Sequence, residues 1–111
     1  MNPNITLKAL EQSALDAHAR LEPTNRDLLL DRYFVRQHLV PVLLFRMQAH
    51  IPMSPAEMAQ LWAEHLGLSE SLQAAWLPKL EATFARFAAL LKDELQQKNP
   101  RIRLQTVLPS T

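Results

Sequence analysis

The chain has 111 residues, of which 48% are hydrophobic and 21% charged, and these proportions favour one folded domain over a disordered chain. Twelve Lys and Arg against eleven Asp and Glu give a net charge of +1, so the whole molecule has no strong attraction for nucleic acid or anionic lipid. The absence of cysteine excludes disulfides, thiolate zinc sites, iron–sulfur clusters and a cysteine nucleophile. A single glycine, Gly67, is too few for a phosphate-binding loop, a dinucleotide fingerprint or a nucleophile elbow.

The start of the chain, residues 1–4, lacks the basic and then apolar pattern of a signal peptide. Every apolar run is also far shorter than the roughly 18 residues that a membrane span requires. We therefore expect a soluble, cytoplasmic protein with no membrane partner.

The first predicted helix runs from about Ile5 to Leu21. Its apolar positions alternate spacings of three and four, which places them on one stripe of a helix. They are Leu7, Leu10, Ala14, Ala17 and Leu21. The helix should stop at Glu22, because Pro23 disfavours the α conformation in the residue before it.

A second, central helix is predicted from near Asn25. Thr24 followed by Asp27 resembles a capping box, and the apolar surface that follows is wider than one stripe, which is typical of a helix with several neighbours. Pro41 stands inside the apolar run 39–44 and would cost about 3 kcal/mol in a helix interior. Either the helix bends there, or it ends near His38 and another helix begins with Pro41 in its first turn. In both cases residues 42–50 should be helical, with most of their apolar side chains buried.

The clearest local signal is the stretch 54–57, Ser-Pro-Ala-Glu, which has serine at the N-cap, proline at the first helical position and glutamate at the third. This helix should end at Gly67 in a left-handed cap, with Leu68 folding back on Trp62 or Ala63. Ser69 then caps a shorter helix. Pro78 bends or restarts the chain, and the last helix runs to about Lys98.

Together these elements predict an all-α fold. We expect a compact, bundle-like domain of four to six helices over residues 1–99, with a kinked or broken central helix at Pro41. Residues 100–111 lose the helical period and should form an extended or flexible C-terminal tail.

No arrangement of residues points to catalysis. None of the four histidines has another histidine four residues away or an acidic residue three residues before it, as helical metal motifs require. Asp27 and Asp31 are one helical turn apart and could share a proton, but a solvated first turn explains them as well. We expect no enzyme, no cofactor and no metal site. The open alternative is an enzyme or ligand carrier with a pocket that contains His38 or His65.

The surplus of apolar residues indicates a protein-interaction module, that is, an adaptor, assembly factor or regulatory subunit. Its partner is another protein chain, a second copy in a homodimer, or both. The predicted partner-binding residues lie on the central helix and are Arg32, Arg36, Val40, Leu43, Phe45, Arg46 and Met47.

The alternative function is a DNA-binding regulator, with nucleic acid possible but not favoured. Residues 55–76 have the spacing of a degenerate helix-turn-helix, with Gly67 in the turn. Ser69, Ser71 and Gln73 would contact DNA. Gln73 occupies a position where a buried aliphatic side chain is expected, and residues 69–76 contain no Lys or Arg to approach phosphates.

Overall fold

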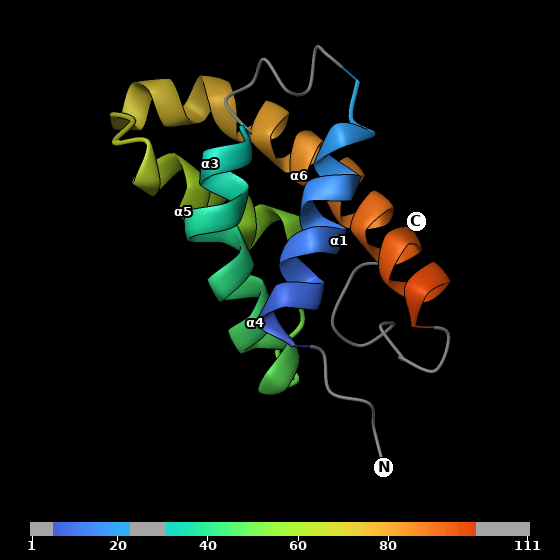
Figure 1. Cartoon of the computed structure of the whole chain (residues 1–111). Coiled ribbons are helices and arrows are strands. Elements are labelled where there is room, and N and C mark those ends of the chain that lie inside the picture. Colours follow the sequence, from blue (N-terminus) through green and yellow to red (C-terminus); the bar gives the residue numbers. More distant parts are fainter. Residues whose placement is uncertain (1–5, 23–30, 100–111) are drawn as a thin grey trace.

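The structure is a computed structural model that describes residues 6–22 and 31–99. Within these ranges the chain forms helices and connecting turns only, packed as a compact bundle (Figure 1). The elements in chain order are α1 (Leu7–Ala19), α3 (Arg32–Phe34), the π-helical turn η1 (Val35–Leu39), α4 (Val40–Gln48), α5 (Pro55–His65) and α6 (Glu70–Lys98). The all-α prediction is confirmed, and the predicted tail lies outside the described residues.

Helix α1 begins at the hydroxyl of Thr6, which accepts a hydrogen bond from the backbone N–H of Ala9 at 3.1 Å. Its predicted stripe is confirmed at four of five positions, which are buried against the rest of the bundle: Leu10, Ala14, Ala17 and Leu21. Leu7 is the exception, with half of its surface exposed, because it lies in the first turn at the edge of the bundle. Side chains spaced along one stripe therefore dock α1 on its neighbours.

The central helix begins later than its sequence predicts. Asp31 has extended backbone geometry, and its carboxylate accepts a hydrogen bond from the N–H of Phe34 at 2.7 Å. The prediction of one helix that runs from near Asn25 through Asp31 is therefore wrong. An Asp side chain that hydrogen-bonds to the backbone favours the N-cap of a helix over its interior. The predicted capping box at Thr24 and Asp27 lies outside the described residues.

Pro41 is accommodated by a change of hydrogen bonding. The helical path continues without a break from α3 through η1 into α4, and Pro41 lies in the first turn of α4. The N–H of Val40 donates to the carbonyl of Val35, five residues back, instead of to the residue four back. Such a widened turn is a known way for a helix to avoid the missing donor and the steric clash of proline. The helix thus does not end near His38, and a π-helical turn precedes Pro41.

Helices α5 and α6 form an antiparallel hairpin through a left-handed glycine. Gly67 has φ 68°, and the N–H of Leu68 donates to the carbonyl of Ala63 at 3.2 Å, which confirms the predicted cap. Helix α5 begins at Pro55 with Ser54 as its N-cap residue and Glu57 in its first turn, as predicted, but neither side chain caps the backbone. The Ser54 hydroxyl makes no capping hydrogen bond, and Glu57 is paired with an arginine of α4 instead of its own helix terminus.

Helix α6 is one element of 29 residues with Pro78 inside it. Figure 1 shows the helix changing direction partway along, where its colour passes from gold to orange. The predicted bend is therefore present, while the predicted restart is wrong. Pro78 and Ala74 are both exposed, so water can solvate the carbonyl that proline leaves without a partner.

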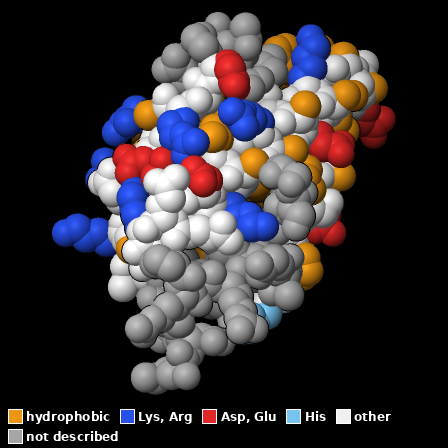
Figure 2. All heavy atoms as spheres, turned by 90° about the vertical axis from the view of Figure 1, so that its right-hand side faces the viewer, with side chains coloured by type: hydrophobic (Ala, Val, Ile, Leu, Met, Phe, Trp, Pro, Cys, Tyr) orange, Lys and Arg blue, Asp and Glu red, His pale blue; other side chains and the backbone are white. Residues whose placement is uncertain are grey.

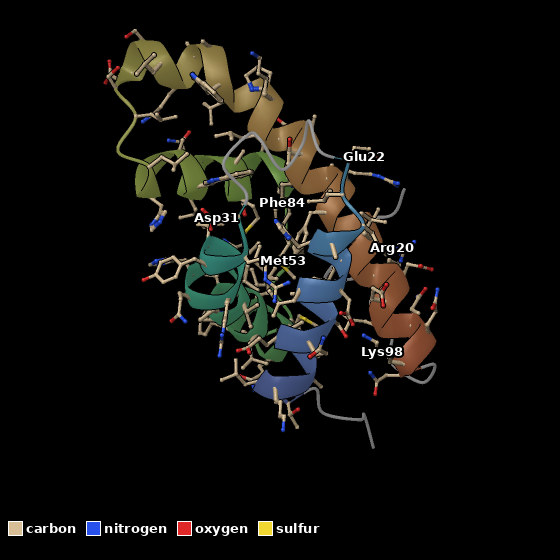
Figure 3. All side chains as sticks on the ribbon, turned by 45° about the horizontal axis from the view of Figure 1, so that its top comes forward. Arg20, Glu22, Asp31, Met53, Phe84 and Lys98 are labelled. Atoms are coloured by element: carbon tan, nitrogen blue, oxygen red, sulfur yellow. The ribbon has the colours of Figure 1, made fainter. Side chains whose placement is uncertain are left out.

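The core is built from all the long elements. Its largest fully buried side chains include Leu10 of α1, Leu43 of α4, Met53 of the connector, and Phe84 and Phe87 of α6. Figure 3 shows Met53 and Phe84 in the interior, whereas Arg20 and Lys98 lie along the outer side of α1 and α6. On that outer side, Lys and Arg side chains stand next to Asp and Glu (Figure 2). In the part of the chain that is described, no helix combines the length and apolar character that crossing a membrane requires.

Candidate functional site

Five aromatic and histidine rings gather where the start of the central helix meets α5. Phe34 is the centre of this cluster, with its ring centroid 5.4 Å from that of Trp62, 5.2 Å from that of His65 and 6.1 Å from that of His38. Tyr33 adds its ring at 5.9 Å from that of His38. Phe34 and Trp62 are 8% and 2% exposed, so they anchor the two helices by burial and ring packing.

His38 and His65 are the closest pair in this cluster, with ring centroids 4.1 Å apart and planes tilted by 47°. His38 lies on the π-helical turn and His65 ends α5. Both residues are exposed, which differs from the buried, pocket-lining histidine of the ligand-carrier alternative. The pair therefore presents two imidazoles to solvent from two different helices.

A second link between these helices lies at their other ends. Arg46 of α4 donates to Glu57 of α5 at 3.1 Å and to the carbonyl of Pro52 at 3.0 Å. Only 17% of its side chain is exposed, so Arg46 fastens the connector and the start of α5 to α4. Its predicted role in partner binding is thereby limited, because its donors already serve the fold.

The two links join the central helix to α5 in opposite sequence directions. His38 faces His65, and eight residues further along, Arg46 faces Glu57 eight residues earlier on α5. In sequence, Val42 lies four residues from both His38 and Arg46, and Leu61 lies four residues from both Glu57 and His65, so each shares a helix face with its neighbours. These six residues are named the seam. It carries an ion pair at one end, aliphatic side chains in the middle and two imidazoles at the other end.

The residues predicted to bind a partner fall into two groups. Val40 and Leu43 have no exposed surface and belong to the core, so burial removes them from the candidate surface, and Met47 packs partly against the core. Arg32, Arg36 and Phe45 are exposed, although Arg36 pairs with Glu11 of α1 at 3.4 Å. Phe45, with 64% of its surface exposed, is the predicted residue that the structure leaves most available.

The expectation that apolar residues between 42 and 50 are mostly buried holds unevenly. Leu43 is fully buried, and Val42, Leu44 and Met47 are partly buried against the core. The predicted burial of Phe45 is wrong, because its side chain lies on the side of α4 that is exposed to solvent.

The residues predicted to contact DNA are engaged in local structure. The Ser69 hydroxyl lies 3.3 Å from that of Ser71 and caps α6 by accepting from the N–H of Leu72. Gln73 is half-buried, accepts from Gln60 of α5 at 3.2 Å and donates to the carbonyl of Leu68 at 2.9 Å. Residues 69–76 are the first part of α6 and lie antiparallel to α5 (Figure 1), so they do not form a separate recognition helix. DNA binding through them stays a prediction without geometric support.

The side opposite the seam is a set of ion pairs between α1 and the C-terminal half of α6. Arg20 donates to Asp93 at 2.8 Å and to Glu94 at 3.1 Å, and Lys98 donates to Asp16. The hydrogen bond from Lys98 lowers the pKa of Asp16, and that from Arg20 lowers the pKa of Asp93. The same bonds raise the pKa of Lys98 and that of Arg20. These charges neutralise one another and hold two helices together, which is a structural task.

The spacing of histidines within one helix does not reveal the pairing of His38 with His65. Packing of the central helix against α5 brings together these two residues, which are 27 positions apart. A signal was nevertheless present: His38, Val42 and Arg46 repeat every four residues, as do Glu57, Leu61 and His65. Across residues 6–22 and 31–99, no group of three or more His, Cys, Asp or Glu side chains could hold a metal ion.

Comparisons of the chain with protein-family models, with curated proteins and with solved structures give no match.

Proposed function

We propose that the chain is a small, non-enzymatic protein-interaction module that works in the cytoplasm, and that its first partner is a second copy of itself. The observation that carries this proposal is the apolar surface along the seam. Tyr33, Phe45 and Leu61 are 68%, 64% and 43% exposed. Large apolar side chains that remain exposed on a folded domain are typical of protein interfaces.

These side chains lie close to the seam on both of its helices. Tyr33 contacts His38 at one end of it, Leu61 belongs to it on α5, and Phe45 precedes Arg46 in the sequence of α4. Aromatic residues supply much of the binding energy of protein interfaces when they become buried. The elongated shape of the seam, with few fixed charges at its centre, suits a helix of the partner lying along it.

A second copy is the occupant that the charge of the chain favours. The net charge is +1, so two copies repel each other only weakly, whereas a large net charge would keep the chain monomeric. A two-fold axis through the seam would place the Leu61 side chains of both copies near each other, because the same patch is used twice in such an interface. Burial of both leucines and their aromatic neighbours would then stabilise the dimer.

The test is light scattering on a sizing column over a concentration series, with the variant Leu61→Arg. We expect the wild-type protein to have twice the mass of the 12.7 kDa chain and Leu61→Arg to be a monomer, because the substitution places two like charges at the centre of the interface. The matched control is Leu72→Arg on α6, since Leu72 is 48% exposed but lies on a helix outside the seam; it should remain a dimer.

A wild-type protein that is monomeric at every concentration would overturn the proposal. So would a dimer that Leu72→Arg disrupts and Leu61→Arg leaves intact. Circular dichroism of each variant separates loss of association from loss of folding.

A further inference from the structure

We propose that His38 and His65 form a two-histidine site for a divalent transition-metal ion, with Zn²⁺ and Cu²⁺ as the ions that it fits. The ion would join the π-helical turn to the end of α5. The proposal does not depend on self-association, because both ligands come from one chain.

The geometry brings two imidazoles to one point. Two nitrogens bound to the same Zn²⁺ ion lie about 2.0–2.1 Å from it, which places them about 3 Å from each other. Two imidazoles that share one ion in this way have ring centroids about 5 Å apart, so the centroids of His38 and His65, now 4.1 Å apart, would have to separate by about 1 Å. Because both side chains are exposed, small rotations about their side-chain bonds can direct one nitrogen of each ring at a shared ion.

The ring nitrogens are also available. Within the described ranges neither His38 nor His65 takes part in a hydrogen bond or an ion pair, and their contacts are with rings: those of Tyr33, Phe34 and each other. A metal would therefore displace water and no protein partner. Imidazole is a preferred ligand of Zn²⁺ and Cu²⁺, and Mg²⁺ and Ca²⁺ prefer oxygen ligands instead.

The surroundings keep both histidines close to each other while leaving their exposed rings free to turn. His65 packs on Phe34, which is itself stacked on the buried ring of Trp62. His38 stands on a π-helical turn, a feature that often occurs at functional sites because it redirects side chains out of the regular helical array. The protein supplies two ligands, so the remaining coordination positions would be filled by water or by an outside ligand, and the affinity should be lower than at a three- or four-ligand site.

The test is calorimetric titration of the untagged protein with zinc chloride and with copper chloride. We expect one ion per chain, with Cu²⁺ binding more tightly than Zn²⁺, as the general order of divalent affinities requires. His38→Ala and His65→Ala should each weaken binding by about tenfold or more, and the double variant should bind hardly less than either single variant, because the two ligands act together.

The control is His50→Asn, which removes a third exposed histidine at a position where asparagine tolerates the local backbone. It should bind both ions as the wild type does. His38→Gln and His65→Gln keep a polar side chain of similar reach and guard against a change of packing around Phe34. Absence of binding in the wild type, or binding that the His38 and His65 variants retain, would overturn the proposal.

Discussion

His50 adopts a backbone conformation that residues with a Cβ rarely take. Its φ is 56°, and it closes α4 in the same way that Gly67 closes α5. The N–H of Ile51 donates to the carbonyl of Arg46, and that of His50 to the carbonyl of Met47, the two hydrogen bonds of a Schellman cap. At the cap after α4 the chain therefore carries a strain that it avoids after α5.

Replacing His50 with glycine should relieve this strain. We expect His50→Gly to raise the free energy of unfolding by about 1 kcal/mol. Left-handed backbone costs an ordinary residue roughly 1–2 kcal/mol, and the greater conformational entropy of glycine in the unfolded chain offsets part of the gain from relieving it. Urea unfolding followed by circular dichroism measures the change.

Gly67→Ala is the reciprocal control. In the described part of the chain no atom lies within 4 Å of the place where a Cβ at Gly67 would be, so its cost of about 1 kcal/mol would come from the backbone alone. Suppose that both His50→Gly and Gly67→Ala lower the free energy of unfolding. The contacts of the His50 side chain would then stabilise the fold by more than its left-handed backbone costs.

Thr83 is buried in α6 with 1% of its surface exposed, and its hydroxyl has no hydrogen-bond partner among the described residues. A buried hydroxyl without a partner lowers stability, because it gives up water and receives nothing in return. We expect Thr83→Val to raise the free energy of unfolding by about 1 kcal/mol, since valine keeps the shape and removes the polar atom. Thr83→Ser should lower it by about 1 kcal/mol, because it removes the methyl group and keeps the hydroxyl. A stabilising Thr83→Ser in the same urea experiment would contradict this explanation.

At the scale of elements, the π-helical turn decides what the central helix presents. A regular α-helix through Pro41 would leave a steric clash and an unpaired carbonyl. The wider turn resolves both, and it carries His38, which faces His65 across the seam. The strongest disturbance in the central helix therefore coincides with the candidate metal site.

The contact between α1 and α6 should weaken in acid. Asp16 and Asp93 have pKa values below their usual 3.8 in the folded chain, owing to hydrogen bonds from Lys98 and Arg20. A carboxyl group whose folded pKa is lowered contributes stability that is fully present above its unfolded pKa and is lost as the pH falls through the folded pKa. We therefore expect the thermal unfolding temperature to fall as the pH is lowered below about 4.

The double variant Asp16→Asn/Asp93→Asn tests this origin. It should unfold at a lower temperature than the wild type at pH 7, and the difference should shrink towards about pH 2, where the wild-type carboxylates are protonated as well. Glu81→Gln serves as the control, because Glu81 is exposed and has no ion pair within the described ranges. A difference that stays constant with pH would contradict the proposed role of the ion pairs.

At the scale of the whole molecule, the helices and most of their ends were predictable from sequence, and their mutual positions were not. The stripe of α1, the start of α5 at Pro55 and the cap at Gly67 follow from local patterns, and each is found. The early start of the central helix was wrong because Asp31 competes for the backbone. Val40 and Leu43 were predicted to bind a partner but are buried. The sequence alone does not distinguish an apolar residue that packs in the core from one that contacts a partner.

The sequence by itself determined the fold class, since periodicity, proline and glycine act over a few residues and are visible along the chain. Only the tertiary structure decided which residues meet across helices. The ring contact of Phe34 with Trp62 and the ion pair of Arg46 with Glu57 join the central helix to α5, and this arrangement brings His38 to His65 and leaves Leu61 exposed. Such an arrangement depends on the packing of large side chains from distant segments, and no local pattern encodes it.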